Sequence, residues 1–215
     1  MCAHWGVDSA TKVTNELYHS VLYNFGNPEF WGRSLSTVQG RAEGLTKEEV
    51  ELLHNNGTKV LPIYNDVQEA VGYQQGRTVG INTIFHARRL AIPEGTVLFA
   101  SVEPFVLIDE EWIRGYVDVL IPCGYRSGIY YNPVQGDFNI AYCNAIRNDP
   151  KVANQLILWS AAPELEATKR SESPPFNPIK PSCRANVWGW QYGRDIETHS
   201  FDTNLIERKL YNLLW

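Results

Sequence analysis

Acidic side chains follow directly on several short apolar runs of the chain. Glu103 follows the run TVLFASV, Asp8 closes HWGVD, and Asp202 lies in a candidate last strand near the C-terminus. If these runs are the strands of a parallel barrel, their ends meet at one rim, where the active sites of such barrels lie. Two carboxyl groups at one rim can cleave a glycosidic bond, because one protonates the leaving oxygen while the other acts as nucleophile or base.

Glu103 is the predicted general acid, because a carboxyl at the mouth of so apolar a run is partly desolvated and its pKa is raised towards neutrality. Asp8 or Asp202 is the predicted partner, and the sequence does not choose between them. Each acid also has a plainer structural interpretation. Glu103 fits a solvated or arginine-paired carboxylate, Asp8 fits a residue that caps a turn, and Asp202 fits the N-cap of the last helix.

Aromatic and polar side chains at the same strand ends are candidates for substrate binding, since aromatic rings stack on the apolar faces of sugars. Trp159 and Tyr192 are predicted to face the ligand, with Tyr131 and Tyr64 behind them. The full predicted set at these strand ends is Tyr64, Asp66, Tyr131, Trp159, Gln191 and Tyr192. None of the five histidines follows a strand together with a serine or cysteine nucleophile, so a catalytic triad is not expected.

Short apolar runs alternate with amphipathic segments along the chain. The candidate strands are residues 4–8, 30–35, 59–64, 96–102, 127–131, 155–159, 187–192 and an eighth around 200–204. The candidate helices are residues 46–56, 76–90, 109–120, 138–147 and a last one near 205–214, and the first of them opens with Thr46 and Glu49 spaced as a capping box. This alternation implies right-handed βαβ crossovers and a parallel sheet. We therefore predict an α/β fold, a single compact (β/α)8 TIM-like barrel domain over residues 1–215.

One helix of this barrel is missing from the pattern. The stretch SESPPFNPIKPSC, between Trp159 and Val187, contains four prolines, which exclude a regular helix interior and predict a surface loop in its place. A doubly wound open sheet is the alternative fold. It would carry a glycine-rich phosphate turn after its first strand, and WGVDSATK contains none.

Composition narrows the functional classes. Hydrophobic residues make up 44% of the 215 residues, which is enough for a large core, and the net charge of −5 argues against nucleic acid as a partner. No apolar run reaches the ~18–20 residues that span a bilayer, and no signal-peptide pattern precedes the first strand. Four cysteines without a CxxC pair make a metal site unexpected and favour buried free thiols over disulfides. We expect a monomer without a cofactor.

Several of these stretches resemble a known family. HWGVDSA, TVLFASVEP, RSGIYYNP, ANVWGWQYG and FDTN occur in the order and spacing of the bacterial glycoside-hydrolase-like barrel domain of unknown function, a relative of the family-25 lysozymes. The resemblance covers nearly the whole chain. It implies a TIM-like barrel, peptidoglycan or a related polysaccharide as the partner, action outside the cell or at its wall, and an acidic cleft that holds Asp8, Glu103 and Asp202. It also implies that Arg33, after the second strand, orients a carboxylate through a bidentate pair.

One position departs from the lysozyme pattern. Family-25 lysozymes close the fourth strand with Asp-x-Glu, whereas this chain has Ser101, Val102 and Glu103. Three functions therefore stay open. The chain is a cell-wall hydrolase in which Asp8, Asp202 or the substrate's own 2-acetamido group replaces the missing acid, a glycan-binding barrel that does not cleave, or an unrelated metabolic barrel enzyme, for which a glycine-rich phosphate site is missing.

Overall fold

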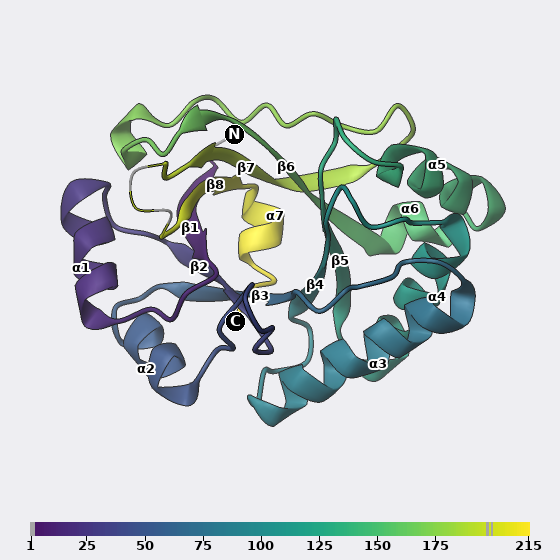
Figure 1. The fold of residues 1–215 in the computed structure, drawn as a ribbon, viewed down its shortest axis with the longest axis horizontal. Coiled ribbons are helices and arrows are strands. Elements are labelled where there is room, and N and C mark those ends of the chain that lie inside the picture. Colours follow the sequence, from purple (N-terminus) through teal and green to yellow (C-terminus); the bar gives the residue numbers. More distant parts are fainter. Residues whose placement is uncertain (1–2, 197, 199) are drawn as a thin grey trace.

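The computed structural model describes residues 3–196, 198 and 200–215. Eight strands form a closed barrel in the order β1 to β8, which confirms the predicted barrel. The strands are β1 (His4–Ser9), β2 (Phe30–Ser34), β3 (Lys59–Tyr64), β4 (Val97–Val102), β5 (Arg126–Tyr131), β6 (Leu156–Glu166), β7 (Asn186–Arg194) and β8 (Asp202–Ile206). In Figure 1, α1 to α6 lie outside this ring of strands.

The helices of the described residues are α1 (Asn15–Asn24), α2 (Lys47–Asn55), α3 (Tyr73–Arg89), α4 (Glu110–Leu120), α5 (Phe138–Asn148), α6 (Lys151–Gln155) and α7 (Arg208–Tyr211). The predicted capping box of α2 is confirmed, because Thr46 and Glu49 exchange side-chain to backbone hydrogen bonds. The sequence pattern did not predict α1 or α6. The last helix is shorter than predicted because β8 continues to Ile206.

The last strand differs from the predicted parallel sheet. Each strand from β1 to β7 is parallel to the next one along the chain, but β8 is antiparallel to both β7 and β1. Only residues 195–201 separate β7 from β8, and a parallel crossover needs about a dozen residues or more. The chain therefore turns straight back. As a result the first residue of β8, Asp202, lies at the mouth where β1 to β7 end.

The interior of the barrel is packed with large side chains. A cluster that includes Phe30, Phe99 and Trp159 fills it, and the rings of Phe99 and Trp159 meet edge to face. Leu210 and Leu214 of the C-terminal segment join the same cluster, so this segment closes the barrel at the end where the strands begin. Figure 1 shows α7 at the centre of the ring. With that end closed, the opposite mouth is the opening available to a ligand.

The proline-rich segment between β6 and β7 lies along one edge of the molecule, where the regular pattern would place a helix (Figure 1). As predicted, it contains no α-helix, only a short 3-10 turn, Arg170–Glu172. Side chains of β5 and α5 hold it in place. The Tyr131 hydroxyl donates to the carbonyl of Ile179, and the Tyr142 hydroxyl donates to that of Arg184.

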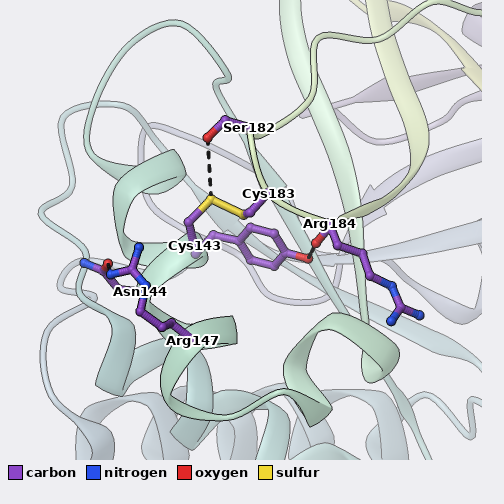
Figure 2. Close-up of a disulfide and its surroundings, with 7 residues drawn as sticks. Cys143, Asn144, Arg147, Ser182, Cys183 and Arg184 are labelled. Atoms are coloured by element: carbon purple, nitrogen blue, oxygen red, sulfur yellow. Dashed lines mark hydrogen bonds between the residues drawn. A yellow bond between two sulfur atoms is a disulfide. The ribbon is translucent and has the colours of Figure 1, made fainter.

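A disulfide between Cys143 of α5 and Cys183 ties the same segment down, as Figure 2 shows. The prediction of free thiols is therefore wrong for these two residues. Their Cα atoms lie 5.8 Å apart although 40 positions separate them in the chain, a proximity that spacing alone does not reveal. Cys123 is a free thiol, and Cys2 lies outside the described residues.

Removing this disulfide is expected to lower the free energy of unfolding by about 2–4 kcal/mol, because the bond closes a long loop of the unfolded chain. The measurement is guanidinium unfolding of the Cys143→Ser/Cys183→Ser double variant, with Cys123→Ser as the control. Reductant should destabilise the wild-type protein and the Cys123→Ser protein. If reductant destabilises the double variant by the same amount, the stabilisation does not come from this bond.

Candidate active site

The acidic site is built from residues whose side chains point into the barrel at its open mouth. Alternation along β1 and β8 sends Asp8, Asp202 and Asn204 inward. Asp8 and Asp202 are directly paired across the antiparallel β1–β8 ladder, which puts both carboxyls on the same face of the sheet. The reversal of β8 thus brings together two acids from opposite ends of the sequence.

Gln191 of β7 joins the two carboxyls. Its Nε2 donates to Asp8 Oδ1 at 3.1 Å and to Asp202 Oδ2 at 2.7 Å. Because both bonds share one nitrogen, these two oxygens lie within about 6 Å of each other. Gln191 is buried, so its amide is a fixed part of the site. The sequence predicted Gln191 as a substrate-binding residue, and the structure places it against the acids instead.

Asn204 holds Asp8 from below. Its Nδ2 donates to Asp8 Oδ1 at 2.7 Å, while its Oδ1 accepts from the Trp159 indole at 3.0 Å. Trp159 and Asn204 are both fully buried. Glycine is required at the neighbouring position 32, because a Cβ there would lie 2.6 Å from the Cβ of Asp8.

The surroundings of Asp8 raise the pKa of its carboxyl strongly. Burial is the main cause and the nearby Asp202 carboxylate the second, and together they raise the pKa of Asp8 to about 8, against the smaller opposing effect of the Asn204 and Gln191 hydrogen bonds. Asp8 therefore holds its proton at neutral pH. A protonated and an ionised aspartate side by side can share one negative charge, which two ionised carboxylates at this distance would not do.

Tyr130 connects this pair to Glu103, and the sequence analysis missed it. Its hydroxyl donates to Gln191 Oε1 at 2.8 Å. The pKa of Tyr130 is raised well above its ordinary value, first by burial and then by the charges of Asp8, Glu103 and Asp202. All three carboxyls are therefore within electrostatic reach of one hydroxyl group.

Glu103 lines an open cleft above this hydroxyl. The cleft has a volume of about 430 Å³. Its described lining residues are Glu103, Pro104, Tyr130, Asn132, Val134, Gln135, Ala161, Ala162, Pro163 and Arg194. Ser101 donates to Glu103 Oε1 at 3.0 Å, so this hydroxyl orients the Glu103 carboxyl. Arg194 stands 3.6 Å from Asp202 Oδ1.

The predicted aromatic platforms are wrong. Trp159, Tyr131, Tyr192 and Tyr64 are all buried and offer no exposed ring face to a sugar. The three tyrosines point outward from their strands into the layer between barrel and helices, because their inward neighbours occupy the opposite face. Trp159 does point inward, but it forms the floor beneath the acids.

Arg33 is also placed differently from the prediction. It lies on the outward face of β2, fully buried, with Nε 2.8 Å from Glu49 Oε1 of α2. Its two terminal nitrogens donate to the carbonyls of Ser9 and Glu43. The arginine therefore fixes α2 and two mouth loops to the barrel, and it does not contact Asp8, Asp202 or Glu103.

Arg33→Lys is expected to lower the free energy of unfolding by about 1.5–3 kcal/mol. A lysine keeps the buried charge, but it lacks the planar guanidinium that donates to the Glu49 carboxylate and to two backbone carbonyls. The matched control is Arg114→Lys, at the more exposed pair with Glu110, with an expected loss of about 0.5 kcal/mol. Urea unfolding measures both. Equal losses of unfolding free energy in the two variants would mean that the buried hydrogen bonds of the Arg33 guanidinium do not stabilise the fold.

Asp66 lies in the loop after β3, where its Oδ1 accepts from Gln68 at 3.1 Å, and no hydrogen bond in the described part of the chain joins it to the three acids. Among residues 3–196, 198 and 200–215, no group of three or more His, Cys, Asp or Glu side chains is placed to hold a metal ion. Nor does any helix in these ranges have the length and apolar character needed to cross a bilayer.

Comparison with known families bears on this geometry. The model of the Rv2525c-like, glycoside hydrolase-like domain matches residues 29–168. The chain belongs to this family. The crystal structure of an uncharacterised protein of B. stearothermophilus is similar to this chain, with 49% sequence identity. The match covers 99% of this chain and 100% of the other, with a TM-score of 0.96. No curated protein sequence matches the chain significantly.

The domain also shares its fold with lysozymes at low identity. A bacterial lysozyme from Streptomyces coelicolor is 11% identical over 99% of this chain and 97% of its own, with a TM-score of 0.56. A GH25 lysozyme from Aspergillus fumigatus is 14% identical over 99% of both chains, with a TM-score of 0.54. The autolysin LytC of Streptococcus pneumoniae, solved with a synthetic peptidoglycan ligand, is 11% identical, and the match covers 95% of this chain but 47% of LytC (TM-score 0.58). The domain thus has a glycoside-hydrolase-like fold resembling that of GH25 lysozymes.

Proposed function

We propose that the chain is a glycoside hydrolase that cleaves an amino-sugar polymer of the bacterial cell wall, with Glu103 as the general acid. One observation carries the proposal: Asp8 and Asp202, joined through Gln191, lie with Glu103 at the end of the barrel that the described C-terminal segment leaves open, and the charges of all three acids raise the pKa of Tyr130. Glycoside cleavage requires carboxyl groups in different protonation states at one cleft. The peptidoglycan bound by LytC and the lysozyme names of the fold relatives support the choice of polymer.

The division of labour follows from the surroundings of each acid. Glu103 faces the cleft, where it can give a proton to the leaving oxygen and later take one from water. Asp202 faces the Arg194 cation, which favours its ionised form, and Asp8 keeps its proton. The pair therefore presents one carboxylate and one neutral acid to the sugar.

Ser101 removes the lysozyme acid that precedes Glu103, so the chain needs another nucleophile. In our proposal the carbonyl oxygen of the substrate's 2-acetamido group attacks the anomeric carbon as the glycosidic bond breaks and Glu103 protonates the departing oxygen. The Asp202 carboxylate accepts a hydrogen bond from the acetamido N–H and stabilises the positive charge that develops on this group. Water then attacks the anomeric carbon, giving its proton back to Glu103 and releasing the acetamido oxygen.

A glycan-binding domain without hydrolysis is the second candidate, and Ser101 is the observation that favours it. A cleft of this shape can hold a glycan after catalysis is lost, because fold and site chemistry vary independently. In that case Glu103 would act only as a hydrogen-bond acceptor for sugar hydroxyls.

The test is release of reducing ends from purified peptidoglycan, with sedimentation binding to the same material recorded in parallel. The wild-type protein is compared with Glu103→Gln. Release by the wild type that is lost in the variant, while both still sediment with the polymer, supports the hydrolase. Binding without release by either protein leaves the glycan-binding domain, and the absence of both rejects the cell-wall polymer.

A further inference from the structure

The cleft above the acids is lined by one acidic and one basic side chain. Glu103, just after β4, lines one wall, and Arg194, which ends β7, lines another. Among the described lining residues, Glu103 is the only carboxylate and Arg194 the only cation. The Arg194 side chain is 56% exposed, so its guanidinium is accessible to a ligand in the cleft.

The contact between Arg194 and Asp202 leaves much of the guanidinium available. The separation of 3.6 Å between Arg194 Nε and Asp202 Oδ1 is an ion pair but longer than a hydrogen bond. A guanidinium carries five N–H donors in a planar fork, which matches the two oxygens of a carboxylate. No other side-chain partner of Arg194 is found in the described part of the chain.

The remaining charges do not prevent an anion from binding here. Asp8 is neutral at pH 7, because burial and Asp202 raise its pKa to about 8. Asp202 is the carboxylate beside Arg194, and Glu103 follows β4, three strands away from β7 in the barrel order. Near β7, an approaching ligand therefore meets the Arg194 cation and the Asp202 carboxylate together, and the arginine is the more exposed of the two.

We propose that Arg194 binds a carboxylate carried by the substrate and so makes the site selective for acidic amino-sugar polymers over neutral ones. The inference rests on the proposed function and adds its substrate class. In peptidoglycan such a carboxylate comes from two sources, the lactyl ether on alternate sugars and the peptides attached to it. Either source presents the same group to the guanidinium.

The experiment compares wild type, Arg194→Gln and Arg194→Lys on three substrates. These are peptide-free glycan strands with a carboxylate on alternate sugars, intact peptidoglycan, and neutral N-acetylglucosamine oligomers. Cleavage and equilibrium binding are both measured, and Arg126→Gln, at the opposite end of the barrel where β5 begins, is the control for loss of an exposed arginine. Peptide-free strands report the sugar carboxylate, and intact peptidoglycan adds those of the peptides.

The wild-type protein should prefer the carboxylated strands, and Arg194→Gln should lower the ratio of carboxylated to neutral binding by about ten-fold or more. Arg194→Lys should restore part of the ratio, and added salt should shrink it. A preference seen with intact peptidoglycan but not with peptide-free strands assigns the contact to the peptides.

Two results overturn the inference. If Arg194→Gln weakens carboxylated and neutral substrates equally, the arginine acts only through Asp202. If the wild-type protein does not distinguish the substrates, or binds none of them, the carboxylate contact does not exist. Binding decides both questions whether or not any polymer is cleaved, so a failure of the proposed hydrolase activity is seen separately in the release of reducing ends.

Discussion

Replacing Glu103 with glutamine is expected to slow release of reducing ends from peptidoglycan by about 10²–10⁴-fold, the usual contribution of a positioned general acid. Glutamine has the same shape and still accepts the hydrogen bond from Ser101, but it has no proton to give to the leaving oxygen. The loss should fall on kcat, because the amide still fills the same place in the cleft. Sedimentation with peptidoglycan should persist.

The control for this experiment is Glu51→Gln, which removes an exposed carboxyl on α2. Circular dichroism and thermal unfolding show whether the variants are folded. A Glu103→Gln protein that releases fragments at the wild-type rate would assign the acid to another residue. In that case Asp8, the neighbouring carboxyl that holds a proton at neutral pH, would be the next to replace.

Asp8→Asn is expected to change how stability depends on pH. An aspartate with its pKa raised to about 8 in the folded protein binds its proton more tightly there than in the unfolded chain, where the pKa is near 4. Between these two values the folded state holds more protons, so this residue makes stability fall as pH rises, by up to about 1.4 kcal/mol per pH unit. Below about pH 4 both states hold the proton, and the residue adds no slope.

Asparagine mimics the protonated aspartate and does not titrate. The difference in unfolding free energy between Asp8→Asn and wild type should therefore grow in favour of the variant from pH 5 to pH 8. Urea unfolding at each pH measures it, and Asp137→Asn, at an exposed position, controls for the change in net charge. A difference that stays constant over this range would show that Asp8 is ionised at neutral pH in the folded protein.

Strand and helix order was predictable because apolar runs and caps are local signals. The α2 capping box and the apolar run of β4 each depend on residues a few positions apart. The barrel followed from counting such elements. The direction of β8 was predictable in principle from the short connection before it, but the expected parallel pattern concealed this signal.

The orientation of side chains at the mouth was harder to predict, because neighbouring residues on a strand face opposite ways. SGIYY offers Tyr130 and Tyr131, and nothing in their type says which faces inward. A usable signal lies two positions earlier, where Gly128 faces a crowded interior: a Cβ there would lie 2.7 Å from the Phe99 ring. Gly6 stands in the same relation to Asp8, and Gly189 to Gln191. Inward glycines therefore mark the face that carries the site.

The disulfide and the Arg33–Glu49 pair could not be predicted in this way. Both join residues from separate elements, and their proximity follows from packing of helices and loops against the barrel. The prediction that Arg33 orients a catalytic carboxylate fails because its side chain lies on the outward face of its strand, as do the side chains of the buried tyrosines predicted to bind sugar. Gly32 takes the inward position on β2, which leaves the outward face to the arginine.

Because β8 runs antiparallel to β1, the distance between Asp8 and Asp202 depends on the register in which the two strands pair. Asp202 faces Asp8 because β8 is held in one register against both neighbours. A slip of a single residue would turn Thr203 into the mouth and Asp202 out towards the helices, while every strand kept a partner. A change in the length of the connection 195–201 that shifted this register would therefore preserve the closed barrel and separate Asp202 from Asp8 without replacing either acid.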